Sequence, residues 1–336
     1  MSKGMRHYAA VMLAPMVLLG GCATAGGPVA SATPGPIAIH GNTSTFEISP
    51  VFLAARDYYP AQATVKMGGI PNLVGEPTIA GFGEAGVADV ATHAETQALR
   101  YSVRNPNLRI ILNISQGLYR IVARRSAGIE NIADLAGKRV ATIPTTSSGY
   151  FLSRMLGTAG LTYDDIEVTT VSPLDAWAQA IDRREVDAVV IWEPYSEQAA
   201  RVLGDDLIEF DGEGVYNEWF NLNTTAENLA DPAQRAKIVT FVRAVMNAAA
   251  VLRTDPTQAQ ALVVERGGFT SGDVRDAWKH HAFPANLPAE ELLAVLVEEE
   301  RWLAERDSRP ARSRDELATL IDTSVYQEAL ALGSGR

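Results

Sequence analysis

Hydroxyl side chains stand where a predicted strand passes into a predicted helix, in the run Thr145–Tyr150. Hydroxyl groups and free backbone N–H groups at the start of a helix favour an anionic or strongly polar group, and the helix dipole adds to this preference. The same hydroxyl groups are also good helix caps, and the two roles can coexist. We therefore include Thr146, Ser147, Ser148 and Tyr150 in a candidate ligand site.

Two further turns follow predicted strands in the first part of the chain. Ser44, Thr45 and Phe46 occupy a turn that matches the first one, and Gln116 and Gly117 follow a buried strand. Ligands of open α/β sheets bind beyond the carboxyl ends of the strands, and a glycine there lets a ligand approach the backbone. We add these five residues to the candidate site, with a solvated turn as the alternative.

His93 follows a predicted strand at 87–91, at the position equivalent to these turns. A neutral imidazole can donate or accept one hydrogen bond to a ligand. His93 and Glu95 are only two residues apart on a turn, which is poor spacing for metal ligands, so we expect no metal and no cofactor. His280 and His281 lie on a predicted late helix, and we expect them at the surface.

Trp192 and Glu193 end a buried strand, so their side chains point to opposite faces of the sheet. One of the two should face the ligand, and the sequence leaves open which one. Trp192 would form an aromatic wall, whereas Glu193 would accept a hydrogen bond from a ligand amine or cap the next helix. Trp219 lies where the chain is expected to return to its first half, as a core residue or a ligand contact.

These residues need a scaffold of strands and helices, and two similar passages supply it. Each passage alternates short β-branched runs with helical segments, which favours mostly parallel sheets with helices on both faces. Beyond Asn223 the apolar residues follow helical spacing. The expected strands are 37–40, 63–67, 86–91, 108–114, 139–143, 166–170 and 186–191, and the expected helices are 48–57, 149–159 and one that ends near 183.

The composition is that of a globular protein that does not bind nucleic acid. The chain has 336 residues, of which 47% are hydrophobic, and its net charge is −11. A nucleic-acid binder needs clustered Lys and Arg to neutralise phosphates. The single cysteine, Cys22, rules out an intramolecular disulfide and a cysteine-based metal site.

The N-terminus has the layout of an export signal, with Lys3 and Arg6 before the apolar run Tyr8–Leu19. The sequence Leu-Gly-Gly-Cys that ends at Cys22 resembles a bacterial lipobox, so we expect residues 1–21 to be a lipoprotein signal peptide and Cys22 to be lipidated. An unmodified thiol beside an ordinary cleavage site is the alternative. Residues 22–36 are small residues, Gly and Pro, and are expected to form a flexible tether.

Several short motifs together resemble the solute-binding proteins of nitrate, sulfonate and taurine ABC importers, a family related to thiamine-pyrimidine synthases. The resemblance covers roughly residues 37–332. It implies a type II periplasmic-binding-protein fold, in which two α/β lobes are joined by a two-strand hinge. Lobe 1 would contain 37–122 plus 219–336, and lobe 2 would contain 123–218. The motifs are Ala133–Val140, Gly160-Leu161, Asp164-Asp165, Val186–Ala188, Trp192–Pro194 and Leu320–Tyr326.

The resemblance implies a monomeric, lipid-anchored, periplasm-facing protein of the cell envelope that passes a small solute to a permease and its ATPase subunit. A sulfonate-, taurine- or nitrate-like anion is the first candidate solute, although no arginine falls at an expected cleft position. A pyrimidine-like thiamine precursor is the second, because Phe46, Tyr119, Tyr150, Trp192 and Trp219 would suit a flat ring. A sensory binding protein is a further alternative. An enzyme like the thiamine-pyrimidine synthases is not expected, since their cysteine motif is absent.

Overall fold

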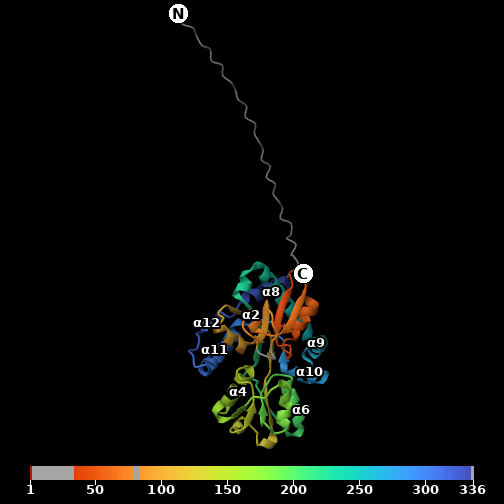
Figure 1. Cartoon of the computed structure of the whole chain (residues 1–336), viewed down its shortest axis with the longest axis vertical. Coiled ribbons are helices and arrows are strands. Elements are labelled where there is room, and N and C mark those ends of the chain that lie inside the picture. The colour runs from red at the N-terminus through yellow and green to blue at the C-terminus, as the bar shows by residue number, and fades with distance from the viewer. Residues whose placement is uncertain (2–33, 79–82, 334–336) are drawn as a thin grey trace. The chain divides into compact units, whose positions relative to one another are not determined.

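Two β-sheets with helices packed on their faces make up the described chain (Figure 1). The structure is a computed structural model and describes Met1 and residues 34–78 and 83–333. The expected signal segment, the expected lipidation residue Cys22 and the tether up to residue 33 lie outside the described residues. The α/β fold class predicted from the sequence is confirmed.

The first sheet has six strands in the order β11-β4-β10-β3-β1-β2. β1, β2 and β3 are parallel, whereas β10 runs antiparallel between β3 and β4. Along the sequence, β10 follows all five strands of the second sheet, so the first sheet combines early and late segments of the chain. Its strands are β1 (Ile37–Gly41), β2 (Ala63–Met67), β3 (Val90–Ala94), β4 (Leu108–Gly117), β10 (Glu218–Thr225) and β11 (His281–Ala282).

The second sheet has five strands in the order β7-β6-β8-β5-β9. β6, β7 and β8 are parallel, and β5 is antiparallel to both β8 and β9. The carboxyl ends of the parallel strands therefore lie at one edge, as a ligand site requires. Its strands are β5 (Arg120–Arg124), β6 (Arg139–Ala141), β7 (Glu167–Thr169), β8 (Ala188–Val189) and β9 (Leu207–Asp211).

The chain crosses between the sheets twice, at residues 118–119 after β4 and at residues 212–217 before β10. We expected the first crossing at residue 122. All five residues of β5 pair with β9, however, so the whole strand belongs to the second sheet. Glu218 begins β10 and pairs with Gly117 in the first sheet. We call the elements around the first sheet lobe 1 and those around the second sheet lobe 2.

Alternation along β5 places helices on both faces of the second sheet. Ile121 and Ala123 pack with residues of one helix, α4, whereas Val122 packs with residues of α5 and α6. Figure 1 shows α4 and α6 on opposite sides of this sheet. The helices are α1 (Ser49–Leu53), α2 (Ile70–Val74), α3 (Glu95–Ser102), α4 (Ser147–Thr158), α5 (Trp177–Asp182), α6 (Tyr195–Leu203), α7 (Ala226–Ala230), α8 (Pro232–Leu252), α9 (Thr257–Gly267), α10 (Ser271–Ala277), α11 (Ala289–Arg306), α12 (Arg314–Ala318) and α13 (Thr323–Gly333).

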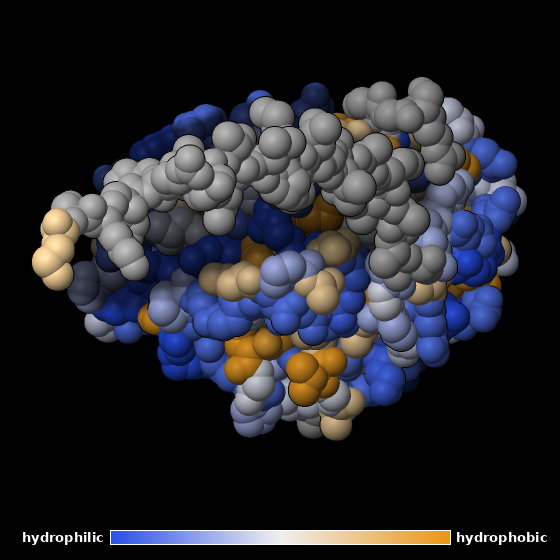
Figure 2. Space-filling view, turned by 90° about the horizontal axis from the view of Figure 1, so that it is seen from above, coloured by the Kyte–Doolittle hydropathy of each residue, from blue (hydrophilic) through white to orange (hydrophobic). Residues whose placement is uncertain are grey.

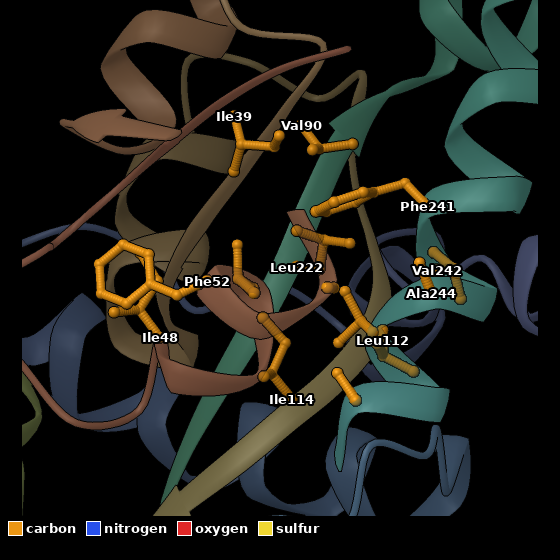
Figure 3. Packing of buried hydrophobic residues seen from close by; sticks show 14 of the residues in the cluster. Ile39, Ile48, Phe52, Val90, Leu112, Ile114, Leu222, Phe241, Val242 and Ala244 are labelled. Carbon is orange, nitrogen blue, oxygen red and sulfur yellow. The ribbon is translucent and has the colours of Figure 1, made fainter. Parts of the chain in front are cut away.

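α8 is the longest helix of the described chain and covers one face of the first sheet. Asp231 caps it by accepting hydrogen bonds from two backbone N–H groups of its first turn, at 2.8 and 3.0 Å, and Pro232 occupies its first position. Its residues Phe241 and Val242 point toward Leu112 and Leu222 of the central strands (Figure 3). The apolar face predicted from helical spacing therefore forms the core of lobe 1.

The strand that we predicted at 86–91 begins later, at Val90. The backbone at Gly86 has a φ of +146°, and the Asp89 carboxylate accepts a hydrogen bond from Ala38 N–H at 2.7 Å, so the preceding segment is a turn. His93 consequently lies within β3, not after it. Val87 and Ala88 of this turn are apolar, as strand residues often are. This resemblance explains why the start of the strand was predicted too early.

The coloured atoms in Figure 2 are mostly hydrophilic, and the hydrophobic ones form small separate groups. Among the described residues, no helix combines the length and the apolar character that crossing a membrane requires.

Candidate functional site

A cavity of about 260 Å³ lies between the two lobes and is lined by residues of both. Its walls follow the carboxyl ends of β1, β2, β3, β6 and β8, where ligands bind in open α/β sheets. The lining residues are Asn42, Thr45, Glu47, Gly68, Gly69, Pro71, Asn72, Thr78, His93, Ala94, Gln97, Arg100, Tyr101, Ile143, Thr145, Thr146, Ser147, Trp192, Glu218 and Phe220.

The loop between β6 and α4 supplies the hydroxyl groups on the lobe 2 side. Thr146 is the cap residue of α4, and its Oγ1 donates to Ile143 O at 2.8 Å. Ser147 is buried, and its Oγ donates to Glu218 Oε1 across the two lobes at 2.9 Å. Tyr119 OH lies 3.0 Å from Ser147 Oγ. Of the four candidates in this run, Thr146 and Ser147 reach the cavity.

On the lobe 1 side, Thr45 and His93 reach the cavity. His93 Nδ1 accepts from Ile70 N–H at 3.4 Å, which leaves the ring proton on Nε2 when the imidazole is neutral. Burial lowers the pKa of His93 to about 4, so the ring is neutral at pH 7. His93 also stacks on Tyr101 with the ring centroids 6.2 Å apart.

The structure decides between Trp192 and Glu193. Trp192 lines the cavity, whereas Glu193 points away, binds Arg120 at 2.9 Å and accepts from Glu197 N–H at 2.9 Å in the first turn of α6. Burial raises the pKa of Glu193 to about 7, although Arg120 opposes the shift. Arg120 also pairs with two further carboxylates, of Glu197 and Glu209, so Glu193 belongs to a structural ion network.

The remaining candidates do not line the cavity. Phe46 is fully buried against Phe269 and His281 in the core of lobe 1. Tyr150 packs on Trp302, and the backbone N–H of Trp219 donates to Glu95. The candidates outside the cavity lining are Ser44, Phe46, Gln116, Gly117, Ser148, Tyr150, Glu193 and Trp219.

Sequence reasoning missed Glu47, Arg100 and Glu218, which all line the cavity. Glu47 comes directly after the predicted turn of Ser44, Thr45 and Phe46, and Glu218 is the first residue of β10. We expected no arginine in the cleft, but Arg100 on α3 reaches it because it lies on the helix face that includes Gln97. Arg100 Nη1 and Gln97 Nε2 each donate to Thr145 O at 3.0 Å, so α3 is tied to lobe 2.

The carboxyl groups of Glu47 and Glu218, which both line the cavity, have shifted pKa values. Burial raises the pKa of Glu218 well above its ordinary value, and the nearby Glu47 and Glu95 carboxyls raise it further. Burial also acts to raise the pKa of Glu47, but the charge of His281 and a hydrogen bond from it outweigh burial and lower the pKa. The two pKa shifts therefore have opposite directions, so Glu47 loses its proton more readily than Glu218 does.

The family described as NMT1/THI5 like matches residues 49–259, which is more than half of the chain. A curated protein of Escherichia coli (strain K12) that is named for binding aliphatic sulfonates is 30% identical over 184 residues. That match covers 53% of this chain and 55% of the relative, so the chain spans about half the length of this relative.

Solved structures share the fold at lower identity. The alkanesulfonate-binding protein SsuA from Xanthomonas axonopodis pv. citri, bound to MOPS, has a TM-score of 0.66 and 17% identity, over 88% of this chain and 100% of that chain. The nitrate-binding protein NrtA from Synechocystis PCC 6803 has a TM-score of 0.66 and 14% identity, over 88% of each chain. The desulfurization enzyme DSZB has a TM-score of 0.57 and 14% identity, over 89% of this chain and 99% of that chain. The fold therefore also occurs in an enzyme. The predicted fold of periplasmic binding proteins is confirmed.

Proposed function

Because the chain belongs to the NMT1/THI5 like family, we propose that it is an extracytoplasmic solute-binding protein that delivers a small organic solute to an ABC importer. The observation that carries this proposal is the cavity lined by both lobes, with the solute-facing loops of β1, β3, β6 and β8 converging on it. The expected partners are the solute, a membrane permease and its ATPase subunit. A monomer suffices, since one chain supplies both walls.

Capture then requires the two lobes to close on the solute. Contacts that cross between the lobes hold the described conformation together, including Ser147 with Glu218 and Arg100 with Thr145. Arg154 and Glu298 add an exposed ion pair at 2.8 Å. Such contacts form only in the closed state, and hinge motion at the two crossings would release them. The solute gains affinity because closure removes it from water.

An organic sulfonate is the first candidate solute. The N-terminus of α4 with Thr146 and the guanidinium of Arg100 are suitable partners for a sulfonate group, and the name of the relative from Escherichia coli supports this class. A pyrimidine-like thiamine precursor is the second candidate, because the aromatic rings of Tyr101, Trp192 and Phe220 line the same cavity.

A thermal-shift panel with native mass spectrometry tests the function on the purified full chain in mild detergent. A solute at 100 times its dissociation constant stabilises the folded state by about 2.7 kcal/mol. We expect an organic sulfonate or an aminopyrimidine to raise the melting temperature, and Thr146→Val to reduce this shift. The matched control is Thr240→Val, since Thr240 lies on α8, outside the cavity lining, and its Oγ1 donates to Ala236 O of the same helix at 2.8 Å. No shift with any compound of the panel contradicts the proposal.

We further propose that the chain catalyses no reaction. Binding and release need no covalent step, and the single cysteine of the chain, Cys22, belongs to the proposed export signal. Recovery of the solute with unchanged mass after prolonged incubation is the expected result. Conversion of the solute would favour the enzyme alternative.

We also propose that Cys22 carries a lipid anchor after signal cleavage and holds the protein at the cell envelope, facing the periplasm. The support is the sequence Leu-Gly-Gly-Cys after a short apolar run. Cys22→Ser should move the protein from the membrane fraction to the soluble fraction and abolish fatty-acid labelling. Retention of the label in this variant would contradict the anchor.

A further inference from the structure

Helix α11 belongs to lobe 1 by its packing. Its buried residues Leu292, Leu296 and Leu303 are part of a core cluster of that lobe. The same cluster contains Leu99 of α3 and Ile110 of β4. The spacing of the three leucines places them on one face of the helix, which is the face that a helix buries against its own domain. α11 therefore moves with lobe 1 when the arrangement of the lobes changes.

A second side of α11 contacts lobe 2. Val295 and Trp302 pack against the core cluster of lobe 2 as well as against that of lobe 1. The ring centroid of Trp302 lies 5.2 Å from that of Tyr150, which is buried on α4. Aromatic pairs at this distance attract each other beyond the effect of the area that they bury. The same helix is thus part of the packing of both lobes.

Arg306 extends this contact by one turn of α11. Its guanidinium carbon lies 5.2 Å from the ring centroid of Tyr163 in lobe 2 and 5.0 Å from that of Trp302. A guanidinium over an aromatic face is attracted by the quadrupole of the ring. The ring of Tyr163 is held in place because its OH donates to Gly149 O of α4 at 2.7 Å. Arg306 therefore lies against one ring of each lobe.

Four residues form one stripe along α11, because they follow one another at spacings of three, four and four residues. They are Val295, Glu298, Trp302 and Arg306, and we call them the α11 seam. Glu298 adds the ion pair with Arg154 of α4 at 2.8 Å, which is exposed and contributes little. None of the four is among the described residues that line the cavity between the lobes. The seam therefore joins the lobes without a contact to the solute.

We propose that the α11 seam is a latch that holds the two lobes together without solute, so that residues outside the cavity determine how easily the lobes separate. Since α4 moves with lobe 2, separation at the two crossings would remove Trp302 from Tyr150 and Arg306 from Tyr163. The inference rests on the proposed function only because the entry of a solute requires the lobes to separate. A latch that favours the closed arrangement also slows the release of any solute inside it.

Double electron–electron resonance between spin labels on the two lobes tests the proposal on the purified full chain in mild detergent, without solute. Ala318→Cys on α12 and Glu185→Cys between α5 and β8 provide exposed label sites in lobe 1 and lobe 2. Cys22→Ser keeps the native thiol from being labelled. We expect the distances in this parent chain to include the distance of the described conformation. A distribution without that distance overturns the proposal.

Two substitutions weaken the latch through different contacts. Trp302→Ala should lower the ratio of closed to open molecules about tenfold, which corresponds to about 1.4 kcal/mol. Arg306→Gln should lower this ratio about threefold, because it removes the cation from the two rings. Arg301→Gln is the matched control, since Arg301 is exposed on the same helix and the substitution removes the same charge. The control should have the distance distribution of the parent chain.

Equal distributions in the parent chain and in both latch variants overturn the proposal, and so does an equal shift in Arg301→Gln. Arg306→Gln keeps the test decisive if Trp302→Ala does not fold, because the side chain of Arg306 is exposed. The outcome is separate from that of the thermal-shift panel, since no solute is present. A shift of the distances in the latch variants together with no thermal shift in the panel would support the latch and contradict the proposed function.

Discussion

Glu299→Gln should change how the stability of the protein depends on pH. Glu299 is fully buried on α11, and Thr96 Oγ1 donates to its Oε1 at 2.9 Å. Burial raises the pKa of Glu299 to about 8, although Thr96 opposes the shift. The neighbouring Glu95 also has a pKa raised well above its ordinary value, by burial and then by Glu299. Glu299 therefore retains its proton at neutral pH in the folded protein, and the pKa of Glu95 is shifted in the same direction.

The sign of the effect follows from proton counting. An unfolded glutamate with an ordinary pKa of 4.5 has lost its proton by pH 6, whereas folded Glu299 keeps it up to about pH 8. The folded state thus binds more protons than the unfolded state, and the free energy of unfolding falls as the pH rises through this window. One proton corresponds to about 1.36 kcal/mol per pH unit, so the loss between pH 5.5 and 7.5 is up to about 2.7 kcal/mol. Glutamine keeps the acceptor for Thr96 but removes this slope.

Urea denaturation at pH 5.5, 6.5 and 7.5 measures the slope for wild type and variant. The control is Glu298→Gln, which removes a charge from the adjacent residue, where the carboxylate is 54% exposed. We expect the slope of Glu298→Gln to follow that of wild type and the slope of Glu299→Gln to be less negative. Parallel lines for wild type and Glu299→Gln would refute the assignment of a buried neutral carboxyl to this position.

Three further substitutions test the site and its scaffold. Gly149→Ala should lower both the melting temperature and the solute affinity, because its Cβ would lie 2.6 Å from the Pro144 backbone and would displace the loop that carries Thr146. The control is Gly157→Ala on the same helix. Its Cβ would meet open space, so this variant should be neutral or more stable by up to about 1 kcal/mol. Trp192→Ala should weaken solute binding about tenfold or more, because it removes an aromatic wall of the cavity. Unchanged titration isotherms would contradict this role. Asp231→Ala should cost about 1 kcal/mol in chemical denaturation, since two N–H groups of α8 lose their acceptor, and equal midpoints would show that the cap is dispensable.

The fold could be predicted from the sequence because its signals are local. The β-branched runs gave the strands, helical spacing gave α8 and α11, and motif order gave the two-lobed arrangement. The strand β3 was predicted four residues too early, because an apolar turn resembles a strand until the hydrogen bond from Ala38 to Asp89 is seen. The first crossing was misplaced for a similar reason, since only pairing with β9 shows where β5 belongs.

The site was harder to predict because it is built from contacts between distant segments. Thr146, Ser147 and Trp192 follow strand ends and could be found by position alone. Glu47 and Glu218 are 171 residues apart by their numbering and come together only when β10 inserts beside β4. Nothing in the local sequence of either glutamate predicts a buried carboxyl pair. The same holds for Arg100, which the sequence places on an ordinary amphipathic helix.

Glu218 connects the second crossing to lobe 2. Glu218 is the first residue of β10, directly after the second crossing, and it accepts the hydrogen bond from Ser147 of lobe 2. The next residue, Trp219, donates its backbone N–H to Glu95 at 2.9 Å. Separation of the two lobes at this crossing would therefore break the hydrogen bond between Ser147 and Glu218, so this contact can exist only while the lobes are together.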